Sequence, residues 1–247
     1  MVPLQNEPPA KIFIDTPLPP ALSLGAAVVP YRTENLRVAP VFGAAALSIS
    51  PRVGHVHVSV DGRRWVWAHA SREPVTVFGL APGPHEIRIK LMTANHQQLD
   101  EGAVKFIVPE TGTTLSSAPN NVRHLHAPAL DHSSIPLRAK IIIDSPLPEP
   151  LARGVVFIRY RTENLELVPI FGDAALSVSP RIGHIHVTVD DAPWHWVEAS
   201  GNPVIVQGLS PGRHRILLEL ANANHKVLDQ GMVELTIPGA TGNPRAR

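Results

Sequence analysis

Apolar and polar positions alternate along two stretches of the first half of the chain. In "HVHVSV" (His55–Val60) three valines alternate with His55, His57 and Ser59. A period of two is that of a β-strand, so the valines are expected to face a core and the histidines to face away from it. "HEIRIKL" (His85–Leu91) shows the same period, with its apolar residues on one face and its charged residues on the other.

Turn signals separate these runs. An Asp-Gly pair at residues 61–62 follows the His55–Val60 run and predicts a hairpin into "WVW" (Trp65–Trp67), and a Pro-Gly pair at residues 82–83 precedes the next strand. The 26 prolines and 17 glycines favour short elements, and no helical period of useful length is present. About seven strands in about 100 residues are typical of an antiparallel β-sandwich.

The pattern occurs twice. "AKIFIDTPLP" at Ala10 returns as "AKIIIDSPLP" at Ala139, an offset of 139 − 10 = 129 residues that holds without insertion through both copies. We therefore predict an all-β protein of two tandem immunoglobulin- or fibronectin-like antiparallel β-sandwiches, residues 10–110 and 139–239. Residues 111–138, rich in Ser, Pro, Asn and His, are predicted to be a linker. We expect the two copies to pack together as a pseudo-dimer.

Composition excludes several classes of partner. A net charge of +1 without a basic run argues against nucleic acid, and no stretch approaches the roughly 20 apolar residues of a membrane span. The absence of cysteine excludes disulfides and thiolate metal sites, and the absence of phosphate-binding glycine motifs argues against a nucleotide cofactor. No signal peptide is visible, so we expect a periplasmic or secreted protein if a leader has been removed and a cytoplasmic one otherwise.

Histidine is the residue that suggests chemistry. The alternate histidines of "GHVHVSVD" (Gly54–Asp61) recur in "GHIHVTVD" (Gly183–Asp190), and an Asn-His pair recurs in a later loop. Alternate side chains on one strand face can bind one ion, and neutral imidazole suits Cu or Zn. The candidate metal ligands are His55, His57, His96, His184, His186 and His225. The alternative is that these histidines are polar residues on the solvent face of a strand.

Tryptophan supplies the second candidate group. Trp65, Trp67, Trp194 and Trp196 follow the two histidine strands. If they share the histidine face, they form the wall of a cofactor or ligand pocket; the alternative is that they pack in the core or at an interface.

The motifs of the second copy resemble a known type of domain. "NLELVP" (Asn164–Pro169), "GHIHVTVD" and "PVIVQGLSPGRHRILLELANANHKVLD" (Pro203–Asp229) are similar to small, His-bearing bacterial domains of unknown function. These are usually exported as single domains, so the resemblance implies the fold and an exported setting but no reaction. The "LSPGRH" corner is also similar to the last third of many immunoglobulin-like domains.

Three functions are compatible with this sequence. The first is a Cu- or Zn-binding protein that uses the strand histidines. The second is a metal-dependent enzyme in which the same histidines hold a catalytic metal, although no catalytic residue can be identified. The third is a metal-free module that binds a small polar ligand or a protein.

Overall fold

Short strands make up most of the chain. The computed structural model describes residues 8–50, 52–110 and 138–239, so the predicted linker at 111–138 lies almost wholly outside the described residues. The first repeat contains β1 (Lys11–Ile14), α1 (Pro19–Leu22), β2 (Ala26–Val29), β3 (Tyr31–Glu34), β4 (Arg37–Val38), α2 (Ala44–Ile49), β5 (Val53–Val60), β6 (Val66–His69), β7 (Val75–Phe78), β8 (Gly83–Thr93) and β9 (Gln98–Val108).

The second repeat has the same elements in the same order. They are β10 (Lys140–Ile143), α3 (Pro148–Ala152), β11 (Val155–Ile158), β12 (Tyr160–Glu163), β13 (Glu166–Leu167), α4 (Asp173–Val178), β14 (Ile182–Val189), β15 (His195–Glu198), β16 (Val204–Gln207), β17 (Gly212–Asn222) and β18 (Val227–Ile237). The predicted all-β class is therefore confirmed. None of the helices in the described ranges has the length and apolar character that crossing a bilayer requires.

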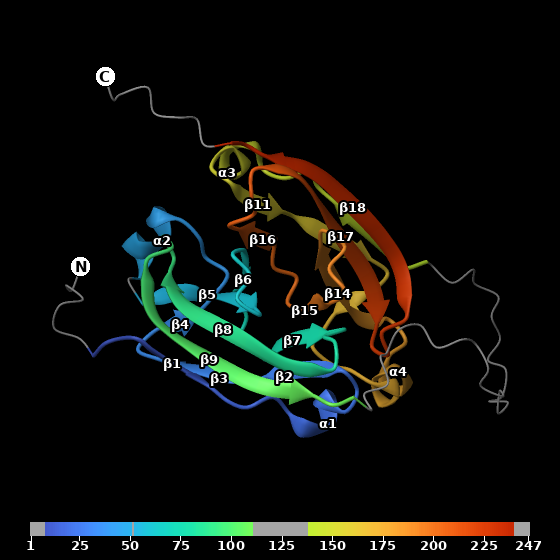
Figure 1. The fold of residues 1–247 in the computed structure, drawn as a ribbon. Coiled ribbons are helices and arrows are strands. Elements are labelled where there is room, and N and C mark those ends of the chain that lie inside the picture. The colour runs from blue at the N-terminus through green and yellow to red at the C-terminus, as the bar shows by residue number, and fades with distance from the viewer. Residues whose placement is uncertain (1–7, 51, 111–137, 240–247) are drawn as a thin grey trace, which may run out of the picture.

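Two seven-stranded sheets dominate the fold, and each contains strands of both repeats (Figure 1). One sheet has the order β11-β16-β6-β5-β8-β9, and the other has the order β18-β17-β14-β15-β7-β2. Strands β2 and β7 of the first repeat thus belong to the sheet of the second, and β11 and β16 belong to the sheet of the first. The repeats are therefore not independent sandwiches, because each sheet is incomplete without strands from the other repeat.

The strand pairs that join the repeats are short and specific. Trp67 of β6 pairs with Val206 of β16, and Trp196 of β15 pairs with Val77 of β7. Most other pairs are antiparallel, but the two-residue strands β4 and β13 run parallel to β5 and β14. The same pairs occur at equivalent positions of the two repeats, so the exchange of strands is reciprocal.

Each repeat also contains a small two-stranded sheet, β1-β3 or β10-β12. The β1 strand is fixed to β9 by a hydrogen bond from the Ile12 amide to Asp100 Oδ2 at 2.9 Å. A Cβ on Gly102 would lie 2.8 Å from Cδ1 of Ile14, so glycine at this position lets β1 approach closely. The small sheet therefore lies on the core face of the large one.

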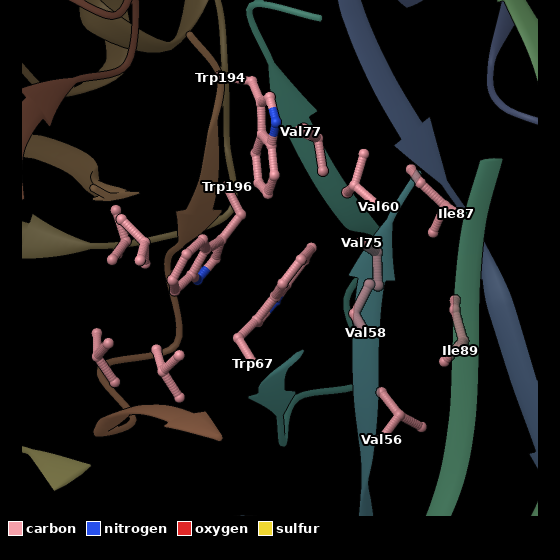
Figure 2. Packing of buried hydrophobic residues seen from close by; sticks show 14 of the residues in the cluster. Val56, Val58, Val60, Trp67, Val75, Val77, Ile87, Ile89, Trp194 and Trp196 are labelled. Atoms are coloured by element: carbon pink, nitrogen blue, oxygen red, sulfur yellow. The ribbon is translucent and has the colours of Figure 1, made fainter. Parts of the chain in front are cut away.

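The main core cluster draws on both repeats, and two small clusters lie apart from it. The predicted alternation holds here, because Val56, Val58 and Val60 are almost fully buried on the core face of β5. Tryptophan rings from the two repeats meet in the middle of this core (Figure 2). Trp67 stacks on Trp196 with ring centroids 4.9 Å apart, and Trp65 stacks on Trp194 at 5.6 Å.

Candidate metal centres

A close contact between β5 and β8 positions the first two histidines. Gly54 pairs with Thr93 across the two strands, and a Cβ on Gly54 would lie only 2.0 Å from the Met92 carbonyl oxygen. Gly183 makes the same approach to the Ala221 carbonyl oxygen. Only glycine fits where two backbones come this close. The residue before each pair of histidines is therefore glycine for a steric reason.

The strand histidines face away from the valines, as the alternation predicts, but they do not face solvent. His55 is 0% exposed and His57 is 5% exposed, and their equivalents His184 and His186 are buried to the same degree. The ring of Phe42 covers His55, with centroids 4.9 Å apart. These burials contradict the alternative that the histidines are polar residues on a wet strand face, because burying an imidazole requires compensation by a partner.

The third histidine comes from the loop between β8 and β9. His96 has a φ of 65°, in the left-handed region that residues other than glycine seldom adopt, and His225 has a φ of 63° in the equivalent loop. A register irregularity between Leu91 and Met92 lies just before the loop. Irregular backbone of this kind re-aims a side chain, and here it directs His96 toward the strand histidines.

The three rings of the first repeat bring one nitrogen each to a common point. His55 Nε2 lies 3.1 Å from His57 Nε2 and 3.3 Å from His96 Nδ1. His96 Nδ1 and His57 Nε2 are 3.2 Å apart. The three nitrogens thus form a nearly equilateral triangle, which we call the first centre.

The second repeat builds the same triangle from His184, His186 and His225. Its three nitrogen–nitrogen distances are 3.0, 3.1 and 3.1 Å, and the contributing atoms are again two Nε2 and one Nδ1. We call this the second centre. All six histidines proposed from the sequence as ligands therefore fall into two groups of three that could each hold a metal ion.

The surroundings keep these imidazoles neutral. Burial is the main cause that lowers the pKa of His57 to about 4 and that of His55 to about 2, and the neighbouring histidines lower both further. In the second centre burial lowers the pKa of His225 to about 4 and that of His184 to about 3. A neutral imidazole is the form that binds a metal, so the cavity selects the ligand form of each ring.

A neutral triangle of this kind is poorly satisfied without a cation. Each imidazole has one N–H and one bare nitrogen. If the inward nitrogens are bare, three lone pairs face one another; if one is protonated, a single N–H must serve two neighbours. The outward Nδ1 atoms of His55 and His184 are buried and have no hydrogen-bond partner among the described residues. A metal ion at the centre would satisfy all three inward lone pairs together.

The two centres differ in what the exchanged strands place beside them. At the first, Gln207 of β16 puts Nε2 3.2 Å from His96 Nδ1. At the second, the equivalent strand supplies Phe78 of β7, whose ring centroid lies 4.3 Å from that of His225. The ring of His195 stacks on His186 with centroids 4.2 Å apart. Each centre therefore contains a residue of the other repeat.

The tryptophans do not belong to this site. Trp67 pairs with Val58 on β5 and Trp196 pairs with Val187 on β14, which places both on the valine face. Trp67, Trp194 and Trp196 lie in the core (Figure 2), and the partly buried Trp65 packs against all three. The expectation that they share a face with the histidines is therefore not met, and the alternative of core packing describes them.

Other histidines have local partners. His85 Nδ1 lies 2.8 Å from Asp61 Oδ2 and its Nε2 lies 2.6 Å from the Ala81 carbonyl oxygen, and His214 makes the equivalent contacts with Asp190 and Ser210. These contacts hold the turns that precede β8 and β17 against the start of each strand. Both ring nitrogens of each corner histidine are engaged, so these two residues are not part of either centre.

Sequence reasoning missed the residues that distinguish the two centres. Gln207 and Phe78 occupy equivalent positions, 207 − 78 = 129, in otherwise similar segments "PVIVQGL" and "PVTVFGL". Comparing the sequences of the repeats reveals this difference. Only the strand exchange shows that each of the two residues lies beside the histidine triangle of the other repeat.

Comparison with known families assigns the chain. The model of a family of unknown function (DUF6130) matches twice, over residues 1–119 and 117–246, so the chain belongs to this family and contains two copies of its unit. The duplication inferred from the 129-residue offset agrees with this match. No protein of curated function matches the chain.

Proposed function

We propose that this member of a family of unknown function is a transition-metal-binding protein that holds one Cu or Zn ion in each three-histidine centre. The observation that carries the proposal is the nitrogen triangle, with sides of 3.0–3.3 Å in both repeats. A tetrahedral ion with metal–nitrogen bonds of about 2.0–2.1 Å separates its nitrogen ligands by roughly 3.3 Å. The triangles therefore have the size that such an ion requires.

The chemistry of the donors supports borderline metals. All three atoms are imidazole nitrogens, which suit Cu and Zn, and no carboxylate of the described residues joins either group. Ca²⁺ and Mg²⁺ prefer oxygen ligands and are disfavoured. The low pKa values also support binding, because protons compete little for these nitrogens near neutral pH.

Duplication supports the proposal independently. The two triangles use equivalent residues, equivalent atoms and the same left-handed loop conformation. Such backbone strain persists only where the surrounding structure holds it, and it is concentrated at functional sites.

Metal content of the untagged protein tests the proposal. After incubation with Zn²⁺ or Cu²⁺ and removal of free metal, elemental analysis should give two equivalents per chain. His55→Gln with His57→Gln should reduce this to one, as should His184→Gln with His186→Gln, and the fourfold variant should bind none.

The matched control removes two histidines that lie outside the described residues. His124→Gln with His126→Gln deletes the same number of imidazoles and should leave two equivalents. The proposal is contradicted if the parent protein binds neither metal above the level of the variant that lacks all four strand histidines. It is also contradicted if only the control pair of substitutions causes a loss of metal.

A further inference from the structure

The surroundings of the two centres differ at several positions, and two of these lie on the strands that join the repeats. Val66 corresponds to His195 and Phe78 corresponds to Gln207, since 195 − 66 and 207 − 78 are both 129. The three ligands and the covering rings, Phe42 and Phe171, are equivalent in the two repeats. A third difference is one of charge, because Lys90 pairs with His57 whereas Glu219, at the equivalent position, pairs with His186.

The first centre has a polar group at its rim and, among the described residues, no fourth imidazole. The Gln207 amide lies 3.2 Å from His96 Nδ1, and His96 is the exposed member of its triangle. Val66 of β6 pairs with Gln207 but carries no donor atom in its side chain. Solvent and a hydrogen-bonding amide are thus available where a bound ion would have its fourth position.

The second centre has a fourth imidazole and an apolar wall instead. His195 stacks on His186, and its Nε2 is buried with no hydrogen-bond partner among the described residues. Phe78, 9% exposed, pairs with His195 across the strands and packs on His225. The ring of His195 lies against that of His186 and the ring of Phe78 lies against that of His225, so rings close the surroundings of this triangle, and Phe78 offers no amide to hold an external ligand.

We infer that the two centres are chemically different: the second is closed by the rings of His195 and Phe78, whereas the first keeps an exchangeable position for water or a small anion beside Gln207. This inference rests on the proposed metal binding. A metal site with three protein ligands leaves a position for an exogenous ligand, which must be accessible to be occupied. The first centre is therefore the one suited to bind a small anionic ligand.

Gln207 has a defined role in this arrangement. In the absence of a fourth ligand its amide is directed at His96 Nδ1. With His96 bound to a metal, the N–H of Gln207 is free to donate to the ligand in the fourth position. A hydrogen bond to a charged acceptor is stronger than a neutral one, so this donor favours an anion. Phe78 provides no such donor at the second centre.

Single-centre proteins loaded with Co²⁺ and titrated with azide test the inference. His184→Gln with His186→Gln leaves only the first centre, and His55→Gln with His57→Gln leaves only the second. We expect the visible spectrum of the first-centre protein to change saturably with azide, and the second-centre protein to bind azide at least about tenfold more weakly.

Reciprocal substitutions assign the effect to residues. In the second-centre protein, Phe78→Gln should strengthen azide binding about tenfold; in the first-centre protein, Gln207→Phe should weaken it about tenfold. Equal azide affinity in both parents, or an absence of azide binding in both, overturns the inference, as does a second centre that Phe78→Gln does not change. If neither protein binds Co²⁺, the proposed function itself fails, so the two failures are distinguishable.

Discussion

The amide nitrogen of Gln207 lies 3.2 Å from Nδ1 of His96, although 111 residues separate the two in the sequence. Gln207 ends β16, which belongs to the second repeat by sequence and to the sheet of the first repeat by pairing. The contact therefore joins the strand exchange to the histidine centre. The large sheets and the histidine centres therefore depend on the same pairing of strands across the repeats.

Separate expression of the halves tests that coupling. Residues 1–119 and 120–247 produced as two chains in one cell should co-purify as a one-to-one complex, because each large sheet takes two strands from the other repeat. Gel filtration with mass determination measures this. Two folded, monomeric halves that do not associate would contradict the exchange of strands.

The contact between β5 and β8 gives a second prediction. Gly54→Ala places a Cβ 2.0 Å from the Met92 carbonyl oxygen, so the strands must separate next to His55. We expect a loss of unfolding free energy on the order of 3 kcal/mol, as for severe overpacking, measured by urea denaturation. Gly239→Ala is the control, because a Cβ there meets nothing within 4 Å. Equal stability of the two variants would show that the close approach of β5 to β8 is not rigid.

The sequence predicts much of this architecture. Alternation at His55–Val60 determines which residues face the core, and the repeated turns determine the strand order within each repeat. It also predicts the six histidines that form the two triangles, because two histidines at alternate strand positions already restrict where a third can meet them.

The exchange of strands could not be predicted in the same way. Segments Pro74–Leu80 and Pro203–Leu209 are nearly identical, so β6 finds an equivalent partner in β7 or in β16, and a hydrophobic pattern cannot distinguish them. The face on which Trp67 lies does not depend on this choice, because Trp67 pairs with Val58 on β5 of its own repeat. Its stacking on Trp196 does depend on the pairing of strands across repeats.

Buried histidines make the metal-free protein sensitive to acid. The pKa of His57 and that of His225 are lowered to about 4 by burial, whereas an unfolded histidine titrates near 6.5. The contribution of these groups to stability is complete above pH 6.5 and is lost as the pH falls toward 4, because only the unfolded chain takes up the protons.

Denaturation of the metal-free protein at pH 7.5 and 5 measures this loss, which should be on the order of a few kcal/mol. The fourfold variant His55→Gln, His57→Gln, His184→Gln and His186→Gln should lose less stability over the same range. A parent and a variant with parallel pH profiles would show that the triangles do not resist protonation.

Glu198 has the opposite pH dependence. It is the core-facing equivalent of His69, and burial, with a smaller contribution from the charge of Glu73, raises its pKa to about 7. An unfolded glutamate ionises near 4.5, so stability is present below that pH and is lost between 4.5 and 7, where only the unfolded chain releases its proton.

Glu198→Gln removes this titration while keeping an oxygen that can accept from the Ser200 amide. The variant should gain stability over the parent at pH 8, by on the order of a few kcal/mol, and gain little at pH 4.5. Glu163→Gln, at an exposed position, is the control and should shift neither value. A benefit that is the same at both pH values would mean that Glu198 does not ionise on unfolding in this range.

Crystals of the untagged protein grown with Zn²⁺ and measured at the zinc absorption edge give the most direct test of metal binding. Two anomalous peaks per chain should appear, one about 2.0–2.1 Å from His55 Nε2, His57 Nε2 and His96 Nδ1, and the other at the same distance from the equivalent atoms of His184, His186 and His225. Fully occupied zinc at other residues, with no peak inside either triangle, would contradict the assignment of these histidines as the metal ligands.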